Sequence, residues 1–76
     1  MRRSAERDAM IRPGQLRDAA GPWIAERRKA KGWTQEQLRA ALKAQGVAIS
    51  RALVSHHESG GTMTLEQLDA YTRALA

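Results

Sequence analysis

The chain has no cysteine, no long apolar run and no phenylalanine. Without cysteine no disulfide can staple a small core, and the composition fits a reducing compartment. No apolar segment approaches the length of a membrane span, and the basic N-terminus is not followed by the apolar core of a signal peptide, so we expect a cytoplasmic protein. Catalysis has little support, because there is no cysteine nucleophile, no glycine-rich phosphate loop and too little chain to build a pocket. No cofactor is expected.

The residues that are present favour helices. Aromatic residues make up 4% of the 76 positions, β-branched residues are few, and alanine and leucine supply much of the apolar content. These residue types have high helix propensity, and a chain of this length forms one small domain with a thin core. We therefore predict an all-α fold, a small bundle of four to five helices, stabilised by helix packing and by any partner subunit.

Three predicted helix starts share one local pattern, in which an apolar residue precedes a hydroxyl residue and a second apolar residue follows four positions later. The three sets are Trp33-Thr34 with Leu38, Ile49-Ser50 with Val54, and Met63-Thr64 with Leu68. In each set the hydroxyl is expected to cap the helix N-terminus, and the two apolar residues form a hydrophobic staple. Gln37 and Gln67 add a capping box to the first and third starts.

These starts predict helices over residues 35–44, 51–58 and 65–75. Ahead of them we expect Gly21-Pro22 to break the chain, with a short helical turn over 15–20 before it and a helix over 22–31 after it, ended by Gly32. Gly46 is expected to end the helix over 35–44. Residues 1–14 lack apolar periodicity and are predicted to be flexible. We divide the chain into a basic arm, 1–20, and a domain, 21–76.

Helical periodicity predicts which residues face the core. The predicted set is Leu38, Ala41 and Leu42, then Leu53, Val54 and His57, then Leu65, Leu68, Thr72 and Leu75. Trp23 and Trp33 each stand at a helix entrance and are interpreted as packing residues. His57 is expected at the edge of the core with a backbone partner. The pair His56-His57 lacks the spacing of a helical zinc site, so no metal is predicted.

The net charge of +5 is concentrated at one end of the chain. Residues 1–31 hold nine basic and four acidic residues, whereas the charges of the remaining residues balance. An anionic partner would meet the N-terminal segment and the first helix. A solvated tail without a partner is the alternative.

The helices over 35–44 and 51–58, joined by a short turn that contains glycine, have the pattern of a helix-turn-helix. Its second helix has the size and shape to enter the major groove of DNA. We predict that the residues turned away from the core on this helix contact base edges: Arg51, Ala52, Ser55 and His56. Arg51 is the strongest candidate, because arginine can donate a bidentate pair to guanine.

Two stretches, GWTQEQL over Gly32–Leu38 and SRALVSHHESG over Ser50–Gly60, resemble the Cro/repressor (Xre-type) family, whose domains have the lambda-repressor-like fold. The resemblance covers about residues 22–75. It implies a sequence-specific regulator of transcription that binds double-stranded DNA, a repressor acting as a homodimer on a palindromic operator, of bacterial, phage or mobile-element origin. It also implies that Gln35 bonds a phosphate and that Arg28 and Glu58 form a structural ion pair. Departures from the family pattern are the longer connection between the two helices and the histidine at position 57.

Phosphate contacts would supply affinity without sequence information. The predicted phosphate-contacting residues are Gln35, Thr34, Ser50, Lys43, Lys31 and Lys29, together with Arg2, Arg3, Arg7 and Arg12 of the arm. Two other functions stay open. One is an antitoxin or other interaction module that neutralises a partner protein, with DNA binding secondary. The other is RNA binding through the arginine-rich arm.

Overall fold

The computed structural model describes the backbone of residues 13–76 and the side chains from Ala20 onward. Regular structure in this part consists of four helices and no strand, which confirms the predicted all-α class. The helices are α2 (Pro13–Ala30), α3 (Gln35–Ala44), α4 (Arg51–Glu58) and α5 (Leu65–Ala74). None of the four has both the length and the apolar character of a membrane span. The arm residues Arg2, Arg3, Arg7 and Arg12 lie outside the described residues.

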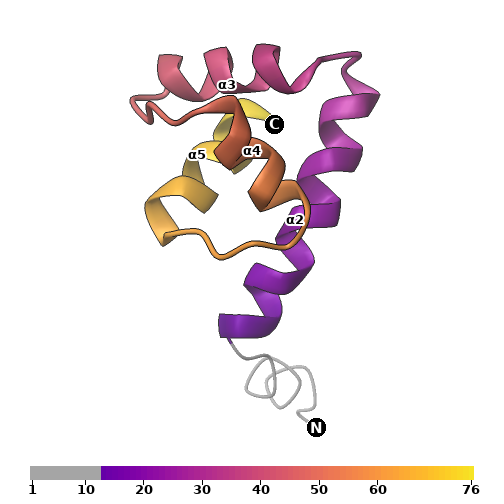
Figure 1. Ribbon diagram of the computed structural model, residues 1–76, viewed down its shortest axis with the longest axis vertical. Helices are drawn as coiled ribbons and strands as arrows, with labels where there is room; N and C mark the ends of the chain where they lie inside the picture. The colour runs from indigo at the N-terminus through magenta and orange to yellow at the C-terminus, as the bar shows by residue number, and fades with distance from the viewer. Residues whose placement is uncertain (1–12) are drawn as a thin grey trace, which may run out of the picture.

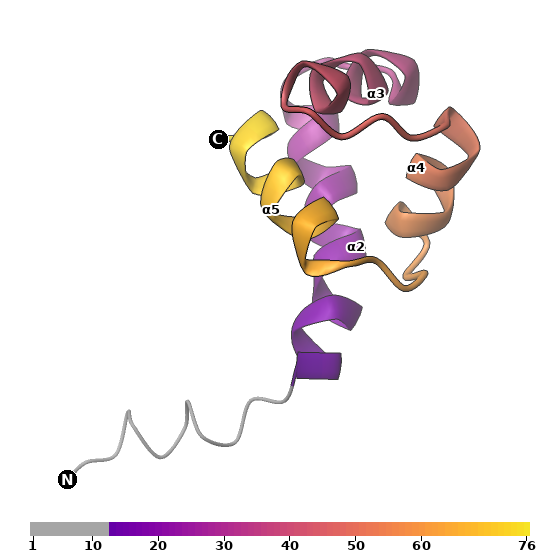
Figure 2. The ribbon, with the colours of Figure 1, turned by 90° about the vertical axis from the view of Figure 1, so that its left-hand side faces the viewer.

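The long helix α2 forms one side of the bundle, and its first turns extend beyond the other helices (Figure 1). α3 lies across the C-terminal end of α2, and α4 and α5 lie to either side of the axis of α2 in the second view (Figure 2). α4 packs against both α2 and α3, while α3 also packs against α5. α4 is therefore held from two directions.

Local hydrogen bonds define the helix starts, as predicted. At α3, the Thr34 hydroxyl accepts from the amide of Gln37 at 3.1 Å, and the Gln37 side chain accepts from the amide of Thr34 at 2.7 Å. Thr64 and Gln67 form the same capping box at α5. At α4, Ser50 accepts from the amide of Leu53 at 3.0 Å. These bonds satisfy amide groups that a helix N-terminus leaves without a partner.

Glycines in the left-handed conformation close three of the helices. Gly32, Gly46 and Gly60 have φ angles of 72°, 90° and 98°. After α4, the amide of Gly60 donates to the His57 carbonyl at 3.0 Å, and the amide of Gly61 donates to the His56 carbonyl at 2.8 Å. This bond pair is a Schellman motif, and equivalent pairs close α2 and α3. The predicted helix ends at Gly32 and Gly46 are confirmed.

The course of α2 corrects the sequence prediction. Instead of a break at Gly21-Pro22, one helix of 18 residues runs from Pro13 to Ala30 with Pro22 inside it. Residues predicted to be the end of the flexible arm are thus helical, and the boundary drawn at residue 20 falls within α2. Packing explains the continuity: Ala20 and Ile24 are buried in the core on either side of the proline, and Pro22 itself is exposed. Burial of the inner face offsets the hydrogen bond that proline cannot donate.

The buried face of α5 also differs from the prediction. Leu75 is buried as expected, but Ala70 and Tyr71 fill the core in place of Leu65 and Thr72. Leu65 is 69% exposed. The helix is rotated so that an aromatic residue with a polar tip, rather than its first leucine, faces α4.

The remaining residues predicted to pack in the core are buried or half-buried, except Trp23. Leu38, Leu42, Val54 and His57 are buried, and Ala41 and Leu53 are half-buried beside them. Trp33 is half-buried and packs against the core. Trp23 does not behave as a packing residue, because it is among the exposed large hydrophobic side chains.

Candidate nucleic-acid interface

α4 presents a short face to solvent on the side away from the core. Arg51, Ala52 and His56 are exposed and Ser55 is half-buried, whereas Val54 on the opposite side is completely buried. We call these four residues the outward face of α4. The helix has 8 residues and is about 12 Å long, a size that the major groove accommodates. The structure thus brings the four predicted base-contacting residues together on one helix.

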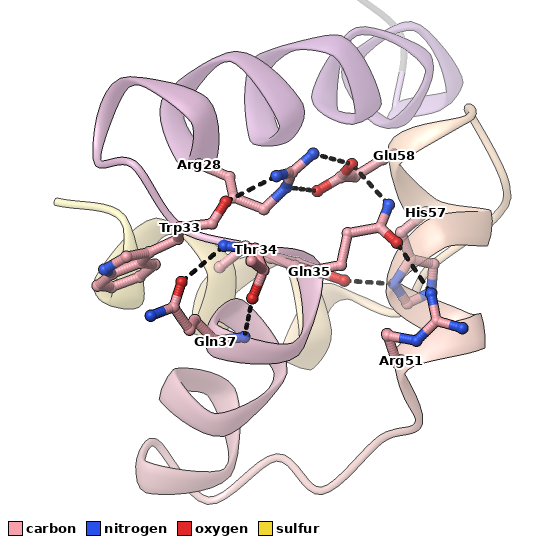
Figure 3. A network of polar contacts seen from close by, with 9 residues as sticks. Arg28, Trp33, Thr34, Gln35, Gln37, Arg51, His57 and Glu58 are labelled. Carbon is pink, nitrogen blue, oxygen red and sulfur yellow. Dashed lines mark hydrogen bonds and ion pairs between the residues drawn. The ribbon is translucent and has the colours of Figure 1, made fainter.

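A chain of polar contacts joins the C-terminal end of α4 to α2 and α3 (Figure 3). Arg28 of α2 donates from Nε and Nη2 to the two carboxylate oxygens of Glu58, at 2.6 and 3.0 Å. Its Nη1 donates to the Trp33 carbonyl at 2.8 Å. Gln35, the first residue of α3, donates from Nε2 to the same carboxylate at 3.1 Å. The predicted Arg28–Glu58 ion pair is confirmed, and it has a third member in Gln35.

The ion pair is charged and mostly shielded from solvent. The side chains of Arg28 and Glu58 are only 12% and 8% exposed. Burial acts to raise the pKa of Glu58, but hydrogen bonds from Arg28 and Gln35 outweigh it and hold that pKa below its ordinary value. The hydrogen bond with Glu58 raises the pKa of Arg28. Because the two charges cancel, the pair contributes no net positive potential; it fixes the placement of α4 against α2.

Gln35 lies between this pair and the outward face of α4. Its Oε1 accepts a long contact of 3.4 Å from Nη1 of Arg51. A side-chain amide has two N–H groups, so one is left for a phosphate after Nε2 has donated to Glu58. No ion pair holds Arg51 among the described side chains; its charge contributes to lowering the pKa of the nearby Glu36, after the larger effect of Arg39. Arg51 can therefore approach a base edge without first breaking an ion pair with a carboxylate.

The other predicted phosphate contacts do not form one cluster. Lys29 and Lys31 lie at the C-terminal end of α2, where Nζ of Lys31 is 5.2 Å from the centre of the Trp33 ring, a cation–π distance. Lys43 lies in the last turn of α3, far along that helix from Gln35. Thr34 and Ser50 cap α3 and α4 and are exposed. The structure places cations at both ends of α3 rather than in one patch.

His57 is fully inside the protein, which corrects its predicted place at the core edge. It is 1% exposed, and its Nδ1 lies 2.8 Å from the hydroxyl of Tyr71, with the two rings edge to face. Its partner is thus a side chain of α5, not a backbone group. Burial lowers the pKa of His57, with a smaller contribution from His56, and burial raises the pKa of Tyr71. The imidazole is therefore neutral at pH 7 and joins α4 to α5.

Tyr71 is the residue that sequence reasoning missed. It is separated from His57 by 14 positions, and no local pattern connects the two residues. Among the described residues, no three His, Cys, Asp or Glu side chains are grouped so that they could hold a metal ion. The chain matches no protein-family model, no curated protein and no solved structure.

Proposed function

We propose that the protein is a sequence-specific regulator of transcription that binds double-stranded DNA through α4, a repressor of the lambda-repressor-like (Xre-type) kind. The main support is the contrast between the two sides of α4. Its inner side is fixed by Val54, His57 and the Glu58 carboxylate, while its outward face carries Arg51 with donors available. A rigidly held short helix whose first arginine forms no ion pair suits base recognition in the major groove.

Phosphate binding would be centred on the start of α3. The first amides of a helix have no partner within the helix, and the helix dipole favours an anion beside them. Thr34 satisfies only the amide of Gln37 there, which leaves the amides of Gln35 and Glu36 to face a phosphate. The second amide proton of Gln35 adds a donor at the same place. A phosphate at this position would lie next to Arg51, so anchoring and base recognition would occur side by side.

The proposal is tested by comparing two arginines and a lysine. A duplex selected from a random library and a scrambled duplex are titrated with protein, and binding is followed by fluorescence anisotropy at several salt concentrations. Arg51→Ala should weaken the selected duplex by about 10- to 100-fold more than the scrambled one. Lys43→Ala should weaken both alike and reduce the salt slope by about 1.

Arg73→Ala is the matched control. Arg73 lies on α5, exposed, in a 3.3 Å ion pair with Asp69, and its replacement removes the same charge as Arg51→Ala. It should change the ratio of the two affinities by less than about twofold. Equal loss on both duplexes for Arg51→Ala would contradict the assignment of α4 as the base-contacting helix.

We propose further that two copies bind one palindromic operator. A two-fold protein on DNA contacts half-sites about 34 Å apart, one helical turn of the duplex. Sedimentation of the protein with a selected palindrome should show two protomers per duplex, and changing the spacing by half a turn should abolish this stoichiometry. One protomer per palindrome at saturation would refute the homodimer.

A further inference from the structure

Two adjacent glycines follow α4, and the backbone requires only the first of them to be glycine. Gly60 has a φ of 98°, in the left-handed region that favours glycine. Gly61 is not among the residues with positive φ. The space beside Gly61 is filled instead by a side chain, because a Cβ at position 61 would collide with Nε2, Cδ2 and Cε1 of His56. The imidazole of His56 fills the space that a side chain at position 61 would need.

This contact directs His56 away from the rest of the outward face. Gly61 follows the C-terminal end of α4, whereas Arg51 is the first residue of the helix. The amide of Gly61 donates to the carbonyl of His56 at 2.8 Å, which holds the two residues at a fixed separation. The imidazole therefore lies against the connection between α4 and α5, at the opposite end of α4 from Arg51.

We infer that Gly61 is a specificity-determining residue, because it provides the space that withdraws the His56 ring from DNA. The inference rests on the proposed DNA binding and refines it: bases are contacted by Arg51, Ala52 and Ser55, and His56 is not one of the base-contacting residues. A side chain at position 61 would push the imidazole outward. Both ring nitrogens would then be free to bond base edges or phosphates.

Four proteins test this inference: the wild type, His56→Ala, Gly61→Ala and the double variant. Position 61 does not have a positive φ, and the three atoms nearest to a new Cβ all belong to a side chain that can rotate. Each protein is used to select duplexes from a random library, and base preferences are read by sequencing. The wild type and His56→Ala should select the same preferences. Gly61→Ala should change the preference at one or more base pairs by about fivefold or more, and the double variant should return to the wild-type pattern.

Two outcomes of the selection would overturn the inference. One is that His56→Ala alone alters base preference as Arg51→Ala does, which would make His56 a base-contacting residue. The other is that Gly61→Ala selects the same preferences as the wild type. Arg51→Ala serves as the positive control, since its loss of selectivity is expected whether or not the His56 ring is withdrawn.

The position of the ring is also measured without DNA, which separates this inference from the proposed function. In NMR spectra of the free protein, the ring protons of His56 should show nuclear Overhauser contacts to the α protons of Gly61. Gly61→Ala should remove these contacts and leave the remaining amide spectrum nearly unchanged. If no protein selects a sequence, the proposed function fails and the spectra still decide where His56 lies. Absence of the contacts in the wild type would overturn the inference.

Discussion

Gly21 lies in the middle of α2, where glycine normally weakens a helix, yet its replacement by alanine should destabilise the protein. A Cβ at this position would lie 2.6 Å from the carbonyl oxygen of His57 and 3.0 Å from the carbonyl oxygen of Glu58 and the amide nitrogen of Gly60. All three are backbone atoms at the end of α4, so no side-chain rotation relieves the contact. Helices α2 and α4 would have to move apart.

The size of the effect follows from two opposing contributions. Alanine is favoured over glycine in a helix interior by about 1 kcal/mol. Against this, inserting a carbon into a tightly packed contact costs about 1–3 kcal/mol, and separating the helices weakens the hydrogen bonds between Arg28 and Glu58, which are of the charged kind worth about 1.5–3 kcal/mol. We expect Gly21→Ala to lower the free energy of unfolding by about 2 kcal/mol, which lowers Tm by roughly 8–16 °C in a domain of this size.

Urea unfolding followed by circular dichroism measures this change directly. Gly61→Ala is the matched control, because the atoms nearest to its new methyl group belong to the movable ring of His56, and it should change the free energy of unfolding by less than about 0.5 kcal/mol. If Gly21→Ala is as stable as the wild type or more stable, helix propensity dominates, and the close approach of α2 to the end of α4 is refuted.

The other predictions use the same unfolding assay. A double-mutant cycle with Arg28→Ala and Glu58→Ala should give a coupling of at least about 1.5 kcal/mol, against less than about 0.5 kcal/mol for the exposed Arg73–Asp69 pair; equal couplings would contradict a structural role for Arg28–Glu58. Stability should fall as the pH drops below about 6.5, the pKa of an unfolded histidine: the folded pKa of His57 is lower, so the unfolded chain binds a proton that the folded protein does not. His57→Leu should remove this dependence between pH 7.5 and 5.5 and His56→Ala should retain it, whereas an unchanged slope in His57→Leu would rule out His57 as its source. Thr34→Ala, which removes the cap of α3, should cost about 1 kcal/mol, and no measurable loss would show that the cap is dispensable.

The helix starts could be predicted from sequence because they depend on residues only a few positions apart. Thr34 and Gln37 exchange their hydrogen bonds within one turn, and Ser50 and Thr64 act over the same distance. The left-handed glycines that close α2 and α3 are equally local. Such short-range hydrogen bonds favour the same boundary whatever the rest of the chain does.

The course of α2 could not be predicted in this way. A Gly-Pro pair normally breaks a helix for local reasons. In α2, Gly21 and Pro22 do not break the helix because of contacts with distant residues. Gly21 fits against the backbone at the end of α4, more than thirty positions away, and Ile24 is completely buried. Tertiary packing overrides a weak local preference here, and a single sequence does not reveal the contact that decides it.

The exposure of the predicted residues on α4 could be anticipated from the sequence, whereas the contacts between the helices could be anticipated only in part. The outward face of α4 follows from helical periodicity, and the Arg28–Glu58 pair follows from the family resemblance. The bridge from Gln35 to Glu58 and the buried His57–Tyr71 pair were not foreseen. Both depend on how α3 and α5 are rotated against α4, and the apolar spacing of α5 pointed to Leu65 and Thr72 instead of Tyr71.

The measurement that tests the central claim most directly is the affinity of the wild-type protein for its library-selected duplex and for a scrambled duplex of equal length and composition, both at about 0.15 M salt. If α4 contacts base edges, the selected duplex should bind about a thousandfold more tightly, and the difference should persist as salt rises. Weak and equal binding of the two duplexes that vanishes with salt would mean that only the net charge of the protein attracts DNA, and would contradict sequence recognition by α4.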